Sequence, residues 1–267
     1  MKTAIIIPAR YGSSRFPGKP LVKLGGESML SRVVNIAQQA AASLKNVTVA
    51  VATEDARISK HCDEIGVQCV MTSENCKTGS DRVLEAAQIL GGDFEFVVGL
   101  QGDAPFTPVE APFKMIQAFT ADPKLEVVTP VARLRWDELD AFRESKKKTP
   151  FSGTTCVMDS KGKALWFSKS ILPAMRKEDE LRKEEFSPVY QHIGLYGFRF
   201  DVLKKFVSLP EGYYEKLEGL EQLRLLENGI SIQTITLDVA SGLAQAGIDS
   251  PEDVERAEKL LAKLAAA

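Results

Sequence analysis

Short apolar runs alternate with helical patterns in the N-terminal part of the chain. The runs at residues 4–7, 47–52 and 94–100 are short and rich in β-branched or aromatic residues, whereas residues 29–43 repeat their apolar positions with a helical period. Strands that alternate strictly with helices form parallel sheets through right-handed crossovers. The sequence therefore predicts an α/β fold with a Rossmann-like, doubly wound and mostly parallel sheet.

The pattern becomes less regular in the C-terminal half. Residues 155–158 and 164–168 are short β-runs separated by Asp-Ser-Lys-Gly, which is typical of a hairpin turn. Residues 172–189 are charged and irregular, so we expect an excursion from the sheet there. A strand over 192–200 and a helix over 217–228 are expected to follow.

Length, charge and cysteine content exclude several classes of protein. With 267 residues, 44% of them hydrophobic, the chain is long enough to form one large domain over residues 1–267. A formal charge of -2 argues against broad affinity for nucleic acids or anionic membranes. The four cysteines lack the spacing of zinc ligands, no signal peptide precedes the first strand, and no apolar segment is long enough to span a membrane. We therefore expect a cytoplasmic protein with reduced thiols.

Cations and hydroxyls are concentrated in the loop over residues 9–20, at the carboxyl end of the first predicted strand. The loop contains Arg10, Ser13, Arg15 and Lys19. Positive charges, hydroxyls and backbone amides suit the oxygens of a polyphosphate, and a basic surface loop that binds nothing is the alternative. The spacing matches neither a Walker A loop nor a GxGxxG fingerprint. Because the Lys-Pro step disfavours helical geometry, we expect an extended loop.

A second polar segment, Lys77-Thr78-Gly79-Ser80-Asp81-Arg82, joins a loop to the start of a predicted helix. Taken alone, it is best explained as a well-capped helix start with Ser80 as the N-cap. The functional alternative is that the glycine and the hydroxyls hold a base or a ribose while Arg82 braces the pocket.

Two aspartates are candidate metal ligands. Asp103 follows the apolar strand 94–100, and a carboxylate at the carboxyl end of a parallel strand beside a phosphate loop suits a divalent cation. The alternative is a turn residue, since Asp, Gly and Pro all favour turns. Asp249 precedes the last predicted helix and could equally be a capping group.

Two further segments carry polar side chains near the C-terminal strands. In the predicted strand over 192–200, His192 and Tyr196 would share one face, although a lone strand histidine is usually structural. Glu221 and Gln222 lie on a predicted amphipathic helix, where Glu221 and Arg224 could form an ordinary surface ion pair.

Together these segments resemble the CMP-Kdo synthetases, the 3-deoxy-manno-octulosonate cytidylyltransferases. Eight blocks occur in the family's order over nearly the whole chain: IIPARYGSSRFPGKPL, VATEDARI, TGSDR, LQGDAPF, ALWFSKSILP, QHIGLYGFR, LEQLRLLENG and GIDSPEDVERAE. The resemblance implies a single nucleotidyltransferase domain of the nucleotide-diphospho-sugar transferase type. It also implies a homodimer, a magnesium requirement and a role in lipopolysaccharide or capsule synthesis, with the region about 150–190 near the dimer interface and the sugar site.

The resemblance also implies roles for individual residues. Contacts to CTP would come from Ala9, Arg10, Ser13, Lys19, Thr78, Ser80, Arg82 and Gln101. Catalytic roles would fall to Arg10, Arg15, Lys19 and Asp103. Magnesium would be held by Asp103 and Asp249, and the acid sugar by His192, Tyr196, Glu221 and Gln222.

Two departures concern the site itself. Ala104 stands where the family commonly has a glutamate after the aspartate, and Thr155 stands where the family commonly has a lysine near the substrates. The sequence therefore leaves three hypotheses open: a Kdo cytidylyltransferase, a cytidylyltransferase for another acid such as 8-amino Kdo, a nonulosonate or a phosphonate, or a nucleotide-binding homologue with little activity.

Overall fold

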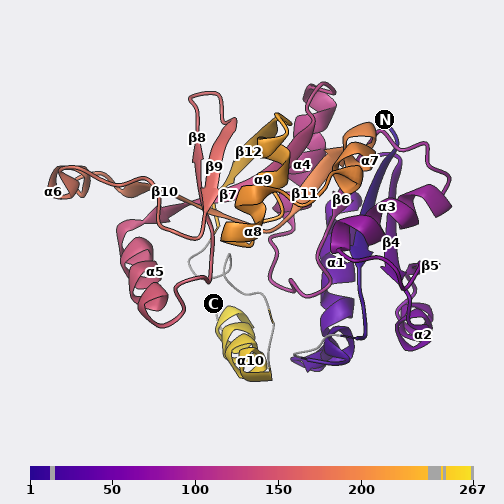
Figure 1. The fold of residues 1–267 in the computed structure, drawn as a ribbon. Coiled ribbons are helices and arrows are strands. Elements are labelled where there is room, and N and C mark those ends of the chain that lie inside the picture. The colour runs from indigo at the N-terminus through magenta and orange to yellow at the C-terminus, as the bar shows by residue number, and fades with distance from the viewer. Residues whose placement is uncertain (13–15, 240–247, 249–250, 266–267) are drawn as a thin grey trace. The chain divides into compact units, whose positions relative to one another are not determined.

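The computed structural model describes residues 1–12, 16–239, 248 and 251–265, and its strands form a mixed α/β architecture (Figure 1). Two compact units can be distinguished, residues 1–116 with 246–267 and residues 117–245. In the described part of the chain, no helix is both long and apolar enough to cross a membrane. The single domain expected over the whole chain stays a prediction.

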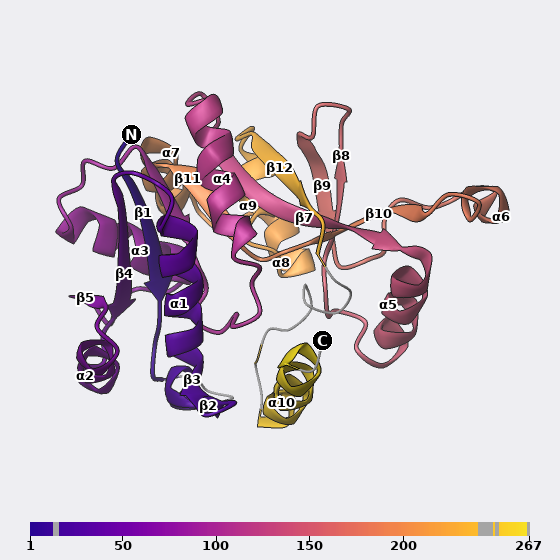
Figure 2. The ribbon, with the colours of Figure 1, turned by 180° about the vertical axis from the view of Figure 1, so that it is seen from behind.

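The first unit is built on four parallel strands in the order β5-β4-β1-β6. All six residues of β1 (Thr3–Pro8) are buried, as is typical of a parallel strand covered on both faces. Helices α1 and α3 pack alongside these strands (Figures 1 and 2). The other elements are β4 (Val47–Thr53), β5 (Gln68–Met71), β6 (Phe96–Gly99), α1 (Met29–Ala41), α2 (Ala56–Glu64), α3 (Gly79–Ile89), α10 (Pro251–Ala265), η1 (Lys19–Leu21), β2 (Lys23–Leu24) and β3 (Glu27–Ser28).

The start of α3 differs slightly from the prediction. The N-cap is Thr78, not Ser80: the Thr78 hydroxyl accepts a hydrogen bond from the Asp81 N–H, and the Asp81 carboxylate accepts one from the Thr78 N–H. This reciprocal capping box satisfies two helix-terminal donors at once, whereas Ser80 is already the second residue of the helix. The expectation of a well-capped helix start is therefore confirmed, with the cap two residues earlier.

The second unit is organised around β7 (Val127–Arg135). Strands β10 and β11 pair with it antiparallel and β12 pairs with it parallel, while β8 joins β10 to β9 through antiparallel ladders. The sheet of the first unit is therefore wholly parallel, as predicted, whereas that of the second unit is mixed. The remaining strands are β8 (Thr155–Met158), β9 (Ala164–Ser168), β10 (Phe186–His192), β11 (Tyr196–Arg199) and β12 (Ile232–Leu237). The helices are α5 (Trp136–Lys148), α6 (Glu178–Leu181), α7 (Phe200–Ser208), α8 (Tyr213–Glu218) and α9 (Leu223–Glu227), and α4 (Glu110–Ala121) crosses the boundary between the units.

Two expected elements are each divided into two. The strand predicted over 192–200 is interrupted, because β10 ends at His192 and β11 begins at Tyr196. The helix predicted over 217–228 is also wrong: Gly219 adopts a left-handed conformation with φ 63° that ends α8, and α9 starts only at Leu223.

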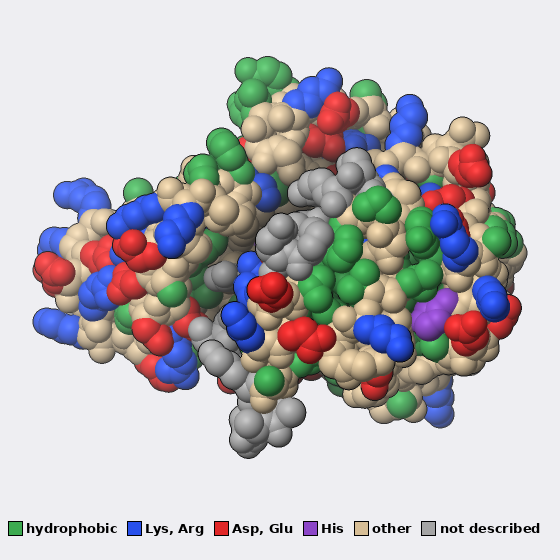
Figure 3. Space-filling view, turned by 90° about the horizontal axis from the view of Figure 1, so that it is seen from below, with side chains coloured by type: hydrophobic (Ala, Val, Ile, Leu, Met, Phe, Trp, Pro, Cys, Tyr) green, Lys and Arg blue, Asp and Glu red, His purple; other side chains and the backbone are tan. Residues whose placement is uncertain are grey.

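The charged excursion over 172–189 contains α6 and the first residues of β10. Arg143 and Arg182 both pair with Glu178 at 2.8 Å, and Arg182 also reaches Asp140 at 2.7 Å. Figure 3 shows basic and acidic side chains interspersed over the part of its face that α5 and α6 form. This network ties α6 to α5, and the two arginines hold the pKa of the Glu178 carboxyl at about 2.

Gly153 is a position where the fold requires glycine. Its φ is +65°, and a Cβ there would lie 2.6 Å from the ring of Phe142, which packs in a buried cluster with Leu139 and Val189. We expect Gly153→Ala to lower the free energy of unfolding by about 2–4 kcal/mol, through left-handed strain and overpacking. Urea titration of the variant measures this loss.

The matched control is Gly194→Ala, because a Cβ at Gly194 meets no atom within 4 Å. We expect this substitution to change stability by less than about 0.5 kcal/mol. Equal losses for the two alanine variants would contradict the steric argument.

Candidate functional site

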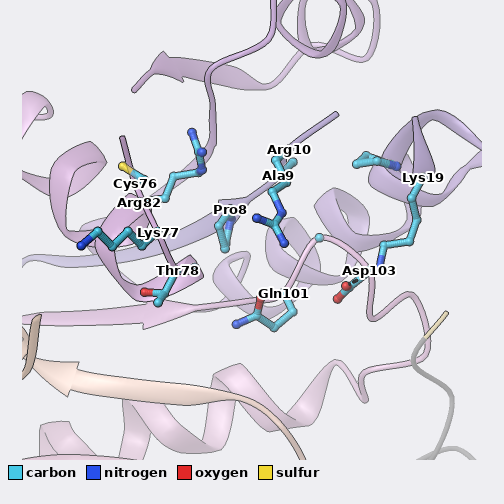
Figure 4. A pocket seen from close by; sticks show the side chains of 13 residues that line it. Pro8, Ala9, Arg10, Lys19, Cys76, Lys77, Thr78, Arg82, Gln101 and Asp103 are labelled. Atoms are coloured by element: carbon cyan, nitrogen blue, oxygen red, sulfur yellow. Dashed lines mark hydrogen bonds and ion pairs between the residues drawn. The ribbon is translucent and has the colours of Figure 1, made fainter. Parts of the chain in front are cut away.

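The first unit carries a polar pocket of about 230 Å³ at the carboxyl ends of β1 and β6 (Figure 4). Open α/β sheets bind ligands at this edge, because the loops that follow parallel strands converge there. The pocket is lined by Pro8, Ala9, Arg10, Lys19, Pro20, Cys76, Lys77, Thr78, Gly79, Arg82, Gln101, Gly102 and Asp103.

Three segments distant in sequence therefore meet at one place, as expected for the nucleotide site. The predicted residues that line the pocket are Ala9, Arg10, Lys19, Thr78, Arg82, Gln101 and Asp103. Ser80 lies in the first turn of α3 and is not among the lining residues. Ser13, Arg15 and Asp249 lie outside the described residues.

Lys19 and Asp103 form an ion pair inside the pocket. The Lys19 Nζ donates to Asp103 Oδ2 at 2.7 Å, and the two side chains point toward one another in Figure 4. The Lys19 side chain is only 11% exposed, whereas that of Asp103 is 40% exposed. The carboxylate thus holds the ammonium in place, and the pair combines a fixed positive charge with an accessible negative one.

The extended geometry expected at Lys19 is wrong. Lys19 begins the short 3-10 turn η1, with Pro20 inside it. Gly18 precedes the turn with φ 74°, in the left-handed region that glycine adopts without strain. The chain turns at Gly18, and the side chain of Lys19 points into the pocket.

The loop after β6 approaches the end of β1 very closely. A Cβ at Gly102 would lie 2.8 Å from the Pro8 carbonyl oxygen, a distance that side chains do not tolerate. Gly102 thereby lets the flanking Gln101 and Asp103 reach the pocket. The N–H of Ile248, the residue before Asp249, donates to the Asp103 carbonyl at 3.3 Å.

Arg82 braces one wall of the pocket from α3. The residue is only 4% exposed, and its guanidinium lies 2.6 Å from Thr72 Oγ1 and 2.7 Å from Glu54 Oε2. A buried guanidinium with two fixed partners is held rigidly, because moving it would leave the charge unpaired. This geometry fits the bracing role predicted for Arg82.

His192 and Tyr196 lie together in the second unit although they belong to different strands. Their ring centroids are 5.3 Å apart, and the Phe167 ring meets His192 at 5.0 Å. Thr129 Oγ1 lies 2.9 Å from His192 Nε2 and donates its only proton to the Leu195 carbonyl at 2.7 Å. The hydroxyl can therefore only accept from His192, which places the imidazole proton on Nε2 and leaves Nδ1 as an acceptor.

Burial determines the protonation of these rings. It lowers the pKa of His192 to about 3, and the positive charge of Lys169 contributes to the same shift. It also raises the pKa of Tyr196, so that its phenol remains a donor at neutral pH. The hydrogen-bonded, neutral His192 is compatible with a structural role as well as with a binding role.

Unsatisfied polar atoms lie beside this group. Tyr196 Oη and Gln222 Nε2 are buried and find no hydrogen-bond partner in the described part of the chain. Such a group costs about 1–3 kcal/mol, which a ligand can recover. The surface pair suggested for Glu221 and Arg224 is wrong, because Arg224 instead donates to the buried Glu215 at 2.7 Å.

Among the described residues that line the pocket, Asp103 is the single carboxylate. The described residues contain no cluster of three or more His, Cys, Asp or Glu side chains that could hold a metal by themselves. Mg²⁺ is commonly bound through one or two carboxylates together with substrate phosphates and waters. The accessible carboxylate of Asp103 beside a cationic loop fits such a site.

The chain belongs to the cytidylyltransferase family, whose family model, described as "Cytidylyltransferase", matches residues 4–232. It is thus a CTP-dependent nucleotidyltransferase. Within that class, it is a member of the CMP-Kdo synthetase family. It is 41% identical to the 3-deoxy-manno-octulosonate cytidylyltransferase of Maricaulis maris (strain MCS10) and 40% identical to that of Bacteroides thetaiotaomicron, in each case over 98% of both chains.

Solved structures agree with this membership. A CMP:2-keto-3-deoxy-manno-octonic acid synthetase complexed with CTP is 32% identical, with a TM-score of 0.82 over 99% of this chain and 100% of that chain. The 4-diphosphocytidyl-2C-methyl-D-erythritol synthase of Anaerococcus prevotii is only 14% identical, with a TM-score of 0.59, and shows the fold alone.

The Lys19 ammonium supplies fixed positive charge to the pocket, so Lys19→Ala tests the role of the loop. We expect turnover with saturating CTP to fall by about 10²–10³-fold, a loss typical of removing one preorganised group that stabilises developing charge. Initial-rate assays of pyrophosphate release measure the effect. The control is Lys23→Ala, which removes an exposed cation of the nearby strand β2. A change below about two-fold, or about 0.4 kcal/mol of barrier, would show that Lys19 has no catalytic role.

The low pKa of His192 makes stability depend on pH in a defined window. The native ring stays neutral down to pH about 3, whereas the unfolded ring takes up a proton below about pH 6.5. Stability therefore falls as pH drops below 6.5, and this residue contributes about 1.4 kcal/mol of the loss between pH 7.5 and 5.5. Urea titrations at the two pH values measure it.

His192→Gln removes this titration and should reduce the stability loss between pH 7.5 and 5.5. His61→Gln is the control, since the His61 ring is partly exposed and bonded to Ser28 and Glu64. A His192→Gln protein with the same pH dependence as the wild type would refute the assignment.

Proposed function

We propose that this chain couples CTP to 3-deoxy-manno-octulosonate (Kdo), giving CMP-Kdo and pyrophosphate for lipopolysaccharide or capsule synthesis. The observation that carries the proposal is the pocket at the ends of β1 and β6, where cations and hydrogen-bonding side chains of three segments meet around the Lys19–Asp103 pair. Support also comes from relatives named as Kdo cytidylyltransferases over 98% of their length and from the similar synthetase solved with CTP.

The nucleotide would occupy this pocket. Its cytosine and ribose would face Ala9, Thr78, Ser80, Arg82 and Gln101, and its phosphates would meet Arg10, Ser13, Arg15 and Lys19. Lys19 keeps its ammonium oriented through Asp103, so no reorganisation is needed when charge develops.

The proposed reaction is an in-line substitution at phosphorus. The anomeric hydroxyl oxygen of the sugar acid forms a bond to the α-phosphorus of CTP and releases its proton to water. The bond from that phosphorus to the bridging oxygen breaks, and pyrophosphate leaves with the bonding electrons. Arg10, Arg15 and Lys19 would stabilise the negative charge that grows on the leaving group. Positioning and charge stabilisation would supply most of the acceleration.

Asp103 and Asp249 would hold Mg²⁺. When bound, the ion would neutralise phosphate charge and help to orient the reacting groups. Ala104 would contribute no oxygen ligand to the ion. Its side chain has no oxygen, and its carbonyl already accepts hydrogen bonds from Thr107.

The acid sugar would be bound by His192, Tyr196, Glu221 and Gln222. His192 Nδ1 can accept from a sugar hydroxyl, while Tyr196 Oη and Gln222 Nε2 can donate. We further expect a homodimer that acts in the cytoplasm, where its four free cysteines would stay reduced.

Pyrophosphate release with CTP, Mg²⁺ and a panel of acids tests the proposal. We expect turnover with Kdo, and we expect chelation of Mg²⁺ to abolish it. The panel includes 8-amino Kdo, a nonulosonate and a phosphonate. Preference for one of these would replace Kdo as the substrate, and tight CTP binding without release from any acid would favour a nucleotide-binding homologue.

A further inference from the structure

The end of strand β9 is held in place through its backbone. Ser168 Oγ donates to Glu218 Oε1 at 2.8 Å, and the N–H of Lys169 donates to Glu218 Oε2, also at 2.8 Å. On its other side, the Lys169 carbonyl accepts a hydrogen bond from Lys146 Nζ at 2.6 Å. Both backbone polar groups of Lys169 are therefore fixed, and its side chain projects from a rigid position.

The ammonium of Lys169 itself has no counter-ion within 4 Å and no hydrogen bond among the described residues, although the residue is half-buried. The nearest acid, Glu218, already uses both carboxylate oxygens for Ser168 and for the backbone of Lys169. Burial lowers the pKa of Lys169, as expected for a cation that lacks close compensation.

A second cation lies close to the first. Lys146 Nζ donates to the carbonyls of Ser152 and Lys169 at 2.6 Å each, and the charge of Lys169 contributes to a lowered pKa for Lys146. Two lysines and one glutamate leave this cluster with one net positive charge. Burying an uncompensated charge is unfavourable, so the cluster favours binding of one monovalent anion.

The cluster adjoins the proposed sugar-binding residues. Phe167, two residues before Lys169, packs its ring against His192, and the charge of Lys169 reaches the His192 imidazole. Glu218, whose carboxylate accepts from the Lys169 N–H, is the last residue of α8. Gln222 follows four residues later, on the connection between α8 and α9. Tyr196, whose ring lies 5.3 Å from that of His192, carries an unsatisfied donor, and so does Gln222.

Thr155 has no free capacity to bind an anion. Its hydroxyl donates to the Ser170 carbonyl at 2.7 Å and accepts from the Leu172 N–H at 3.2 Å, and the residue is fully buried. Thr155 thus braces the segment after Lys169 and provides no charge. The cation nearest to this position on the neighbouring strand is Lys169, since Thr155 pairs with Ser168.

We propose that Lys169 binds the carboxylate of the acid substrate and thereby restricts the enzyme to acid sugars. This inference rests on the proposed function, because it concerns the second substrate of that reaction. The carboxylate supplies the counter-ion that Lys169 lacks, while Tyr196 and Gln222 donate to oxygens of the same ligand. Glu218 and Lys146 are positioning residues that act through the backbone of Lys169.

The test compares Kdo with its neutral carboxamide in wild-type protein and in Lys169→Gln. We expect the wild type to prefer the acid by about 10²-fold in kcat/KM, and we expect the variant to lose most of this preference. KM for CTP should be unchanged, and Lys169→Arg should keep the preference for the acid. Lys163→Gln is the matched control, since Lys163 is exposed at the other end of the same hairpin strand.

The outcomes separate the two proposals. If the wild type releases no pyrophosphate with Kdo or any other acid, the proposed function fails. If the wild type is active and Lys169→Gln prefers Kdo over the carboxamide as strongly as before, the role of Lys169 is refuted while the function stands. Loss of activity with both sugars, together with a lowered melting temperature, would likewise refute a specific role and indicate a structural one.

Discussion

The close approach of the loop after β6 to the end of β1 is the constraint on which the pocket of the first unit depends. Both strands are parallel and adjacent, so their loops leave the sheet at the same edge. Only a residue without a side chain fits against the Pro8 carbonyl, and Gly102 meets that requirement. Asp103 can then accept a hydrogen bond from Lys19, which belongs to the loop after β1. Lys19 directly follows Gly18, whose left-handed conformation turns that loop.

The pocket of the first unit and the residues around Lys169 differ in how their positive charges are paired. In the pocket, Lys19 is paired with Asp103 and Arg82 with Glu54, so these two cations are already compensated and held in place. Within the described part of the second unit, Lys169 lacks a close counter-ion and two buried donors lack acceptors. Phosphates that carry several charges can bind to preorganised pairs, whereas a single carboxylate gains most from an uncompensated cation.

Much of the fold followed from periodicity, because buried parallel strands and amphipathic helices leave clear patterns in the sequence. The errors lie where a single glycine or a cap decides the local geometry: Gly219 divides the expected helix, and Thr78 caps α3 in place of Ser80. Residue types also pointed to the cationic loop after β1, whose residues Arg10 and Lys19 line the pocket. Lys169 could not be singled out from its residue type, because its position depends on Glu218 of α8, a residue distant in sequence whose two oxygens accept from Ser168 and from the Lys169 N–H.

The hydroxyl of Thr129 has a consequence for the chemistry of His192. Because that hydroxyl donates to the Leu195 carbonyl, it fixes the imidazole in one tautomer, and burial keeps the ring a very weak base. A group with a pKa of about 3 cannot remove a proton from a sugar hydroxyl efficiently near neutral pH. In the proposed reaction, His192 would therefore orient a hydroxyl without deprotonating it, and the nucleophile would lose its proton to another acceptor.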